Sequence, residues 1–127
     1  MGKYSRDKGK RGERGWASFC REEGFEGVMR TAQFCGRTGD ASDCVGLPGI
    51  HQEVKFVEHL NIREAYRQAE HDALAAKKGD LPIVAHKRSN DIWMVIMRAE
   101  DCSRFTESGK PEERHSEKGT VRAVLFV

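Results

Sequence analysis

The spacing of apolar residues predicts a first long helix near the start of the chain. Trp16, Phe19 and Cys20 recur at helical intervals within a segment that runs from about Gly9 to Glu23. Gly24 follows as a natural stop, because glycine readily leaves the helical conformation. We therefore expect a helix over residues 9–23 whose apolar stripe faces a core.

A second helix is predicted more clearly in the middle of the chain. Asn61 and Glu64 have the spacing of a capping box, in which side chains satisfy backbone N–H groups at a helix start. The helix should end at the two lysines and the glycine of residues 77–79. Six residues on one face form its apolar stripe, namely Ile62, Ala65, Tyr66, Ala69, Ala73 and Ala76.

Five short apolar segments have the composition of strands. Three lie between the helices and two follow the second helix, at residues 28–34, 44–47, 50–57, 81–86 and 92–97. The last two are continuously apolar, so we expect them to be the most buried strands. The order α-β-β-β-α-β-β predicts an α/β fold with a mixed central sheet flanked by helices.

The remaining segments carry weaker signals. Residues 35–42 are rich in glycine and small polar residues and predict a loop, and residues 99–105 fit a short helix. Residues 106–119 are polar and linker-like, whereas the apolar residues 120–127 fit either a final strand or part of an oligomer interface. We expect residues 1–127 to form a single domain, because one core suits this length.

Composition and charge narrow the class of protein. With 38% hydrophobic and 33% charged residues and no apolar run of about 20 residues, we expect a soluble, cytoplasmic protein. The net charge is +2, but the first 14 residues hold six basic and two acidic side chains. This concentration is typical of a segment that meets phosphates, although residues 1–8 alone fit a flexible basic tail equally well. The expected phosphate contacts are Lys8, Lys10, Arg11 and Arg14.

The cysteines and histidines do not form a zinc motif. Cys20, Cys35, Cys44 and Cys102 are widely and irregularly spaced, and the five histidines lack H-E-x-x-H spacing. We therefore expect reduced, mostly buried thiols and no zinc site.

The segment SDCVGLPGIHQEVK contains the residues that we weight most. Asp43 opens one strand, and alternation along the next strand puts Glu53, Lys55 and His51 on one face. Two neighbouring carboxylates repel unless a cation lies between them. Mg²⁺ suits such an oxygen site, and the Val54 carbonyl is placed to join Asp43 and Glu53 as a ligand. Lys55 would then orient a water that attacks a phosphodiester and offset the developing charge.

A solvent-facing Glu53–Lys55 pair is the competing interpretation, because E-x-K alone is a weak signal. The register of the two strands also matters. If a two-residue turn joined them, Cys44 would oppose Glu53 and Asp43 would point to the wrong face. The metal site therefore requires a shifted register, supplied by a bulge near Asp43 or by a three-residue loop that includes Leu47.

These residues resemble the PD-(D/E)XK nuclease superfamily, and within it the Holliday-junction-resolvase-like branch, which includes small phage and prophage proteins. The resemblance runs from about Lys8 to Cys102. It implies a restriction-endonuclease-like core in which Asp43, Glu53 and Lys55 are the two metal-binding acids and the lysine. It also implies Mg²⁺ as the cofactor, with Mn²⁺ as a substitute, in a bacterial or phage-infected host cell.

The resemblance assigns further residues to the site. It implies that Glu13 is a catalytic residue and metal ligand, that Gln68 is catalytic, and that Arg30 contacts DNA. We also expect Arg37 to contact DNA. Structural roles compete with three of these: a helix-start glutamate for Glu13, a cross-strand ion pair for Arg30 and a loop-bonded glutamine for Gln68. Two features differ from the family: Ser42 stands where the family has proline, and residues 35–42 read CGRTGDAS where archaeal resolvases have a serine-glycine loop. These differences concern junction specificity more than the catalytic core.

We therefore predict a Mg²⁺-dependent endonuclease that cleaves branched or otherwise structured DNA. We expect a homodimer, because symmetric cleavage of a junction needs two active sites. A nicking or restriction-like nuclease with another DNA substrate is the alternative within enzymes. A DNA-binding recombination accessory module without catalysis is the alternative outside them, and the presence of Asp43, Glu53 and Lys55 together argues against it.

Overall fold

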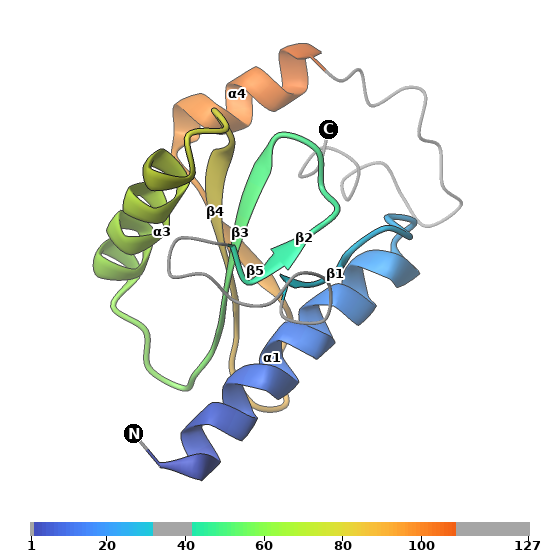
Figure 1. The fold of residues 1–127 in the computed structure, drawn as a ribbon, viewed down its shortest axis with the longest axis vertical. Helices are drawn as coiled ribbons and strands as arrows, with labels where there is room; N and C mark the ends of the chain where they lie inside the picture. Colours follow the sequence, from blue (N-terminus) through green and yellow to red (C-terminus); the bar gives the residue numbers. More distant parts are fainter. Residues whose placement is uncertain (1, 32–41, 109–127) are drawn as a thin grey trace. The chain divides into compact units, whose positions relative to one another are not determined.

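The structure is a computed structural model that describes residues 2–31 and 42–108, and side chains as far as Ser103. By its contacts the chain divides into two compact units, residues 1–96 and 97–127. Among the described residues, the first unit holds a sheet and two helices, and the second holds one helix (Figure 1). The elements are α1 (Lys3–Glu22), β1 (Met29–Arg30), β2 (Cys44–Val45), β3 (Ile50–Phe56), α3 (Ile62–Ala76), β4 (Leu81–Lys87), β5 (Met94–Ile96) and α4 (Ala99–Ser108).

The five strands form one mixed sheet in the order β1-β2-β3-β4-β5. Neighbouring strands are antiparallel except β3 and β4, which are parallel and paired from Ile50–Leu81 to Phe56–Lys87. A parallel pair needs a crossover connection, and α3 provides it. The predicted α/β class, the mixed sheet flanked by helices and the order of the elements are confirmed.

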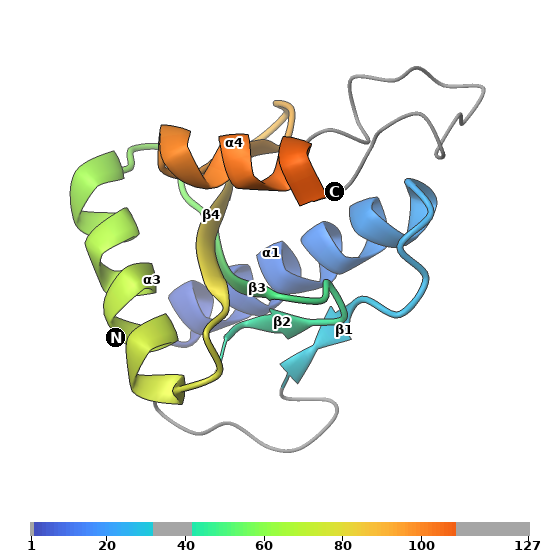
Figure 2. The same cartoon turned by 90° about the horizontal axis from the view of Figure 1, so that it is seen from above.

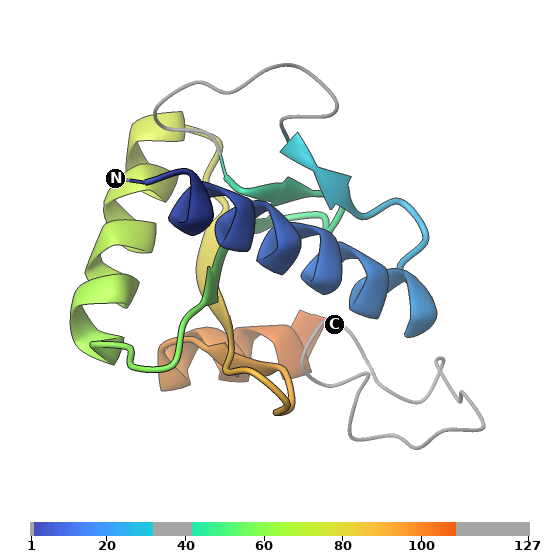
Figure 3. The same cartoon turned by 90° about the horizontal axis from the view of Figure 1, so that it is seen from below.

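Helices α1 and α3 cover opposite faces of the sheet. The Gln52 side chain of β3 faces α1, where Trp16 Nε1 donates to Gln52 Oε1 at 2.8 Å. On α3, Ala69 packs in a buried cluster with Val84 of β4. Val84 is the register partner of Glu53, which follows Gln52 and is therefore directed to the other face. Figures 2 and 3 show β3 and β4 passing between the two helices.

The predicted caps and core residues of both helices are largely confirmed. Asn61 caps α3, because its side chain accepts from the Glu64 N–H at 3.1 Å. Trp16 is fully buried, and its ring lies 5.3 Å from the ring of Trp93. Ile62, expected in the apolar stripe of α3, is instead exposed at the first turn of that helix.

Helix α1 begins earlier than the apolar pattern predicted. It starts at Lys3 rather than Gly9, with Gly2 as its N-cap residue, so the interpretation of residues 1–8 as a flexible tail is wrong from Lys3 onward. The first two turns are polar and exposed, and therefore lack the periodic apolar signal by which a sequence reveals a helix. A helix that is already formed extends through such residues at little cost.

Strand β5 is less buried than predicted. It lies at the edge of the sheet and pairs with β4 alone, and its first residue, Met94, is 58% exposed. Strand β4 lies inside the sheet and is buried at Ile83 and Val84, as expected. A continuous apolar run therefore does not distinguish a central strand from an edge strand that keeps an apolar surface.

Other predicted boundaries also shift. Strand β1 comprises Met29–Arg30, shorter than the predicted 28–34, and residues 32–34 lie outside the described residues. Residues 106–108, expected in a linker, belong to α4. The predicted loop at 35–41, the rest of the linker and the apolar residues 120–127 lie outside the described ranges. None of the described helices combines the length and apolar character needed to cross a bilayer.

Candidate functional site

The register between β2 and β3 is shifted by one residue from that of a regular two-residue hairpin. The Ile50 N–H donates to the Leu47 carbonyl at 3.1 Å, which closes a turn over residues 48 and 49. Beyond this turn, Cys44 pairs with Gln52. From the turn to this pair, the chain advances three residues on the β2 side, from 47 to 44, but only two on the β3 side, from 50 to 52. The β2 side therefore contains one extra residue, a β-bulge.

Gly46 lies within the bulge and makes it possible. Its φ is +104°, in the region that favours glycine, and a Cβ at this position would collide with the backbone of Gly27. With this register, Asp43 rather than Cys44 lies opposite Glu53. The register that the metal-site hypothesis required is therefore confirmed.

Asp43 holds its carboxylate against the backbone of β3. Its Oδ2 accepts from the Val54 N–H at 2.8 Å, where a backbone carbonyl would otherwise continue the ladder. The Asp43 backbone is fixed on both sides, because its N–H donates to the Gln52 carbonyl at 2.8 Å and its carbonyl accepts from the Thr31 N–H at 3.0 Å. The carboxylate therefore lies beside the peptide group that follows Glu53.

Glu53 and His51 share one face of β3, as alternation predicted. Glu53 is 7% exposed and His51 is 3% exposed. Their side chains share a hydrogen bond of 2.7 Å between His51 Nε2 and Glu53 Oε1. Glu53 is thus a buried carboxylate with a polar partner on its own strand.

Helix α3 adds a second carboxylate on this side of the sheet. One ligand atom each from Asp72, His51 and Glu53 lies within 4.8 Å of the others. Gln68, one turn earlier on α3, donates from Nε2 to both Asp72 oxygens, at 3.2 and 3.3 Å. Gln68, predicted as a catalytic residue, therefore contacts Asp72 rather than a loop, which makes it a positioning residue in this arrangement.

Lys55 follows Val54 and lies on the same face of β3 as Glu53. It is partly buried, and it pairs in register with His86 of β4. Within residues 2–31 and 42–103, no carboxylate forms an ion pair with Lys55. Its ammonium group is therefore not committed to a described carboxylate.

Glu13 and Arg30 form a buried pair between α1 and β1. Glu13 lies on the buried face of α1, and its Oε1 accepts from Arg30 Nε at 3.4 Å. Arg30 is 6% exposed, so the expectation that it contacts DNA does not fit its position. Cys44 Sγ donates to the Glu13 carbonyl at 3.6 Å, which brings the backbone of Glu13 close to the residue after Asp43.

The basic residues expected to contact phosphates lie between Lys8 and Arg14 on α1. Lys10, Arg11 and Arg14 are exposed. Lys8 is partly buried, 3.9 Å from Glu58 and 5.0 Å from the centroid of the Phe56 ring. Arg37, the remaining predicted contact, lies outside the described residues.

The described cysteines are free thiols, as expected. Cys20 and Cys44 are buried and Cys102 is partly buried, while Cys35 lies outside the described residues. Burial raises the pKa of Cys20 to about 12 and raises the pKa of Cys44 further. These two thiols are therefore neutral core residues rather than nucleophiles.

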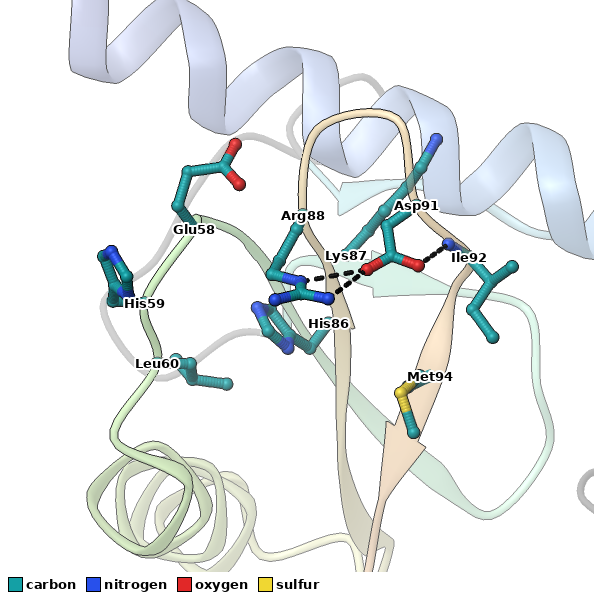
Figure 4. A pocket seen from close by; sticks show the side chains of 9 residues that line it. All are labelled: Glu58, His59, Leu60, His86, Lys87, Arg88, Asp91, Ile92 and Met94. Carbon is teal, nitrogen blue, oxygen red and sulfur yellow. Dashed lines mark hydrogen bonds and ion pairs between the residues drawn. The ribbon is translucent and has the colours of Figure 1, made fainter.

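A pocket of about 360 Å³ lies where the parallel strands β3 and β4 end. Figure 4 shows that the Arg88 guanidinium pairs with Asp91, and that His86 and Leu60 also line the pocket. His86 Nε2 is 2.9 Å from the Val57 carbonyl. The lining combines basic, acidic and apolar side chains, namely His59, His86, Lys87, Arg88, Glu58, Asp91, Leu60, Ile92 and Met94.

Hydrogen bonds hold the two acidic residues of this pocket, Glu58 and Asp91, in place. Hydrogen bonds from the Ser89 side chain and from the Ser89 N–H, the latter at 3.0 Å, lower the pKa of Glu58. The Ile92 N–H and Arg88 likewise lower the pKa of Asp91. Both carboxylates stay charged at neutral pH and partly offset the basic residues around them.

No known protein family, curated protein or solved structure matches this chain. The arrangement of Asp43, Val54 and Glu53 is therefore interpreted from its own geometry and chemistry.

Sequence reasoning missed Asp72 and the pocket. Asp72 lies three residues after Ala69 and one before Ala73, so it borders the apolar stripe of α3 and shares its inward side. An acidic residue in that position, four after Gln68, was a usable signal. The pocket has no such signal, because its lining comes from three separate segments.

Proposed function

We propose that this protein is a metal-dependent endonuclease that hydrolyses phosphodiester bonds of branched or structured DNA. The observation that carries the proposal is the 2.8 Å hydrogen bond between Asp43 Oδ2 and the Val54 N–H. It joins the Asp43 carboxylate to the peptide group between Glu53 and Val54, one residue before Lys55. The element order and the mixed sheet further support a restriction-endonuclease-like core.

The residues at this point fit a Mg²⁺ site. Asp43 and Glu53 are both buried, and a cation would offset the cost of keeping two such carboxylates ionised. Their carboxylates and the Val54 carbonyl would hold the ion, and Mn²⁺ would substitute for it. When bound, the ion supplies Lewis-acid chemistry that polarises a phosphate and activates water. Glu13 is not included as a ligand, because its carboxylate pairs with Arg30.

Lys55 is the catalytic cation in this proposal. Its ammonium group shares the Glu53 face and forms no ion pair with a described carboxylate. It would donate hydrogen bonds to the attacking water and offset the negative charge that develops on the phosphate. Gln68 acts indirectly, through Asp72.

Exposed basic residues of α1 would bind the DNA backbone. Lys10, Arg11 and Arg14 project from the surface of the helix, and Lys8 lies near Glu58 at the edge of the pocket. Phosphate contacts of this kind position a duplex without reading its sequence. We further propose a homodimer, since two symmetric cuts in a junction need two active sites.

The test is cleavage of a labelled four-way junction, a flap and a linear duplex, each with Mg²⁺ or EDTA. We expect Mg²⁺-dependent cleavage that favours the junction. Lys55→Ala and Asp43→Asn should each lower the rate by at least about 100-fold. The first removes the cation that offsets the charge of the transition state, and the second removes a carboxylate ligand of the metal ion. Lys78→Ala, an exposed lysine after α3, is the matched control and should cleave like the wild type.

The other outcomes separate the alternatives. Preference for linear duplex would indicate a restriction-like or nicking nuclease. Binding of DNA without cleavage of any substrate, with Lys55→Ala behaving like the wild type, would indicate an accessory module and remove the enzyme proposal.

A further inference from the structure

We propose that His51, Glu53 and Asp72 form a binding site for a divalent transition-metal ion. The three side chains come from β3 and α3, and one ligand atom of each lies within 4.8 Å of the other two. The site goes beyond the proposed nuclease function, because it can bind metal whether or not the protein cleaves DNA. Its one link to the proposed Mg²⁺ site is Glu53, which belongs to both.

The separations suit a first coordination shell. Ligands about 2.1 Å from a metal lie about 3.0 Å apart at right angles and about 4.2 Å apart when opposite. His51 Nε2 and Glu53 Oε1 are already 2.7 Å apart, and the remaining separations are within 4.8 Å. Small side-chain movements therefore bring all three atoms onto one ion.

Two of the three ligands are buried, and the third is held by a contact at the helix surface. His51 and Glu53 project from the same face of β3, which is paired on both sides, and both are more than nine-tenths buried. Gln68 donates to both oxygens of Asp72, the kind of outer contact that orients a ligating carboxylate. The Asp72 side chain is 15% exposed, which leaves a side of the group open to water or a substrate atom.

The donor set selects the class of metal. An imidazole nitrogen favours first-row transition metals over Mg²⁺ and Ca²⁺, whereas two carboxylates keep Mn²⁺ and Fe²⁺ within range. With three protein ligands, the coordination shell of such an ion would be incomplete and would accept further oxygen ligands. A metal-free hydrogen bond between His51 and Glu53 is the competing interpretation, and the experiment must exclude it.

The experiment uses the full chain with Mn²⁺ as the probe, in excess Mg²⁺. Pulsed electron paramagnetic resonance should detect coupling between Mn²⁺ and an imidazole ¹⁴N, which the all-oxygen Mg²⁺ site does not provide. Calorimetry should give a dissociation constant that rises more than about 100-fold in His51→Gln and in Asp72→Asn. Gln68→Ala, which removes an outer contact, should raise it by about 10-fold.

His71→Gln is the matched control. His71 is exposed and also contacts Asp72, at 3.3 Å, but its loss should leave the ¹⁴N coupling unchanged. Absence of the coupling in the wild type, its persistence in His51→Gln or its loss in His71→Gln would overturn the proposal. The wild-type spectrum decides the question even where a variant fails to fold.

Asp43→Asn separates this inference from the proposed function. It should abolish DNA cleavage while keeping the ¹⁴N coupling, because Asp43 is not among the three ligands. If the wild type shows the coupling but cleaves no DNA, the metal site stands and the nuclease proposal fails. If it cleaves DNA without the coupling, the reverse holds.

Discussion

At the residue scale, three buried acids of the site each contact a different group. Glu13 pairs with Arg30, Glu53 with His51, and Asp43 with the Val54 N–H. A charge inside a protein is costly unless it is paired and hydrogen-bonded, so these contacts fix the position of each side chain. These contacts therefore help to orient Glu13, Glu53 and Asp43.

The Glu13–Arg30 pair provides a direct test of this arrangement. Both side chains are 8% exposed, so removing one partner should leave the other charge poorly compensated. Glu13→Leu and Arg30→Met should each lower the free energy of unfolding by about 3 kcal/mol, and the double variant by less than the two together.

Chemical denaturation of the four proteins measures this coupling. Asp91→Asn, which breaks an exposed pair with Arg88, is the control and should change stability little. Strictly additive losses in the Glu13 and Arg30 variants would show that the two side chains do not interact.

At the element scale, the bulge in the β2–β3 connection is the feature that places Asp43. Gly46 and Gly49 both have positive φ, +104° and +77°, but their surroundings differ. A Cβ at Gly49 meets nothing within 4 Å, whereas a Cβ at Gly46 collides with Gly27. The two glycines are thus a matched pair that separates backbone strain from steric conflict.

We predict that Gly46→Ala destabilises the protein by at least about 2 kcal/mol more than Gly49→Ala. The Gly49 variant should lose about 1 kcal/mol, the cost of a left-handed conformation for a residue with a side chain. Urea denaturation measures both, and equal losses would contradict the steric account of the bulge.

The sequence predicted the elements better than the contacts between them. Alternation put His51 and Glu53 on one face, and the capping residue Asn61 marked the start of α3, because both signals are local. From the sequence we also predicted the register that Asp43 needs, with either a bulge or a three-residue loop as its cause. The partner of Arg30 and the approach of Asp72 to Glu53 depend on how helices dock on the sheet, which local periodicity does not encode.

At the scale of the whole molecule, charge is distributed unevenly. The exposed basic residues 10, 11 and 14 gather on α1, while the buried acids Glu13, Asp43 and Glu53 lie among the helices and strands of the same unit, residues 1–96. The net charge of +2 hides this separation. If α1 binds a DNA backbone, affinity should depend strongly on salt concentration.

We predict that Arg11→Gln and Arg14→Gln each weaken DNA binding and reduce the slope of log affinity against log salt by about 0.9. Binding is measured with EDTA present, so that cleavage does not interfere. Arg63→Gln, an exposed change on α3, is the control and should keep the wild-type slope. An unchanged slope in both α1 variants would place the DNA elsewhere.

The bulge also makes the placement of Asp43 depend on the number of residues in the β2–β3 connection. Nine residues separate Asp43 from Glu53, and one of them is the extra residue of the bulge. Deleting a residue there would restore a regular hairpin and turn Asp43 away from Val54, although every residue of the site would remain in the sequence. A substitution that preserves the register should therefore disturb the placement of Asp43 less than a single-residue insertion or deletion in this connection.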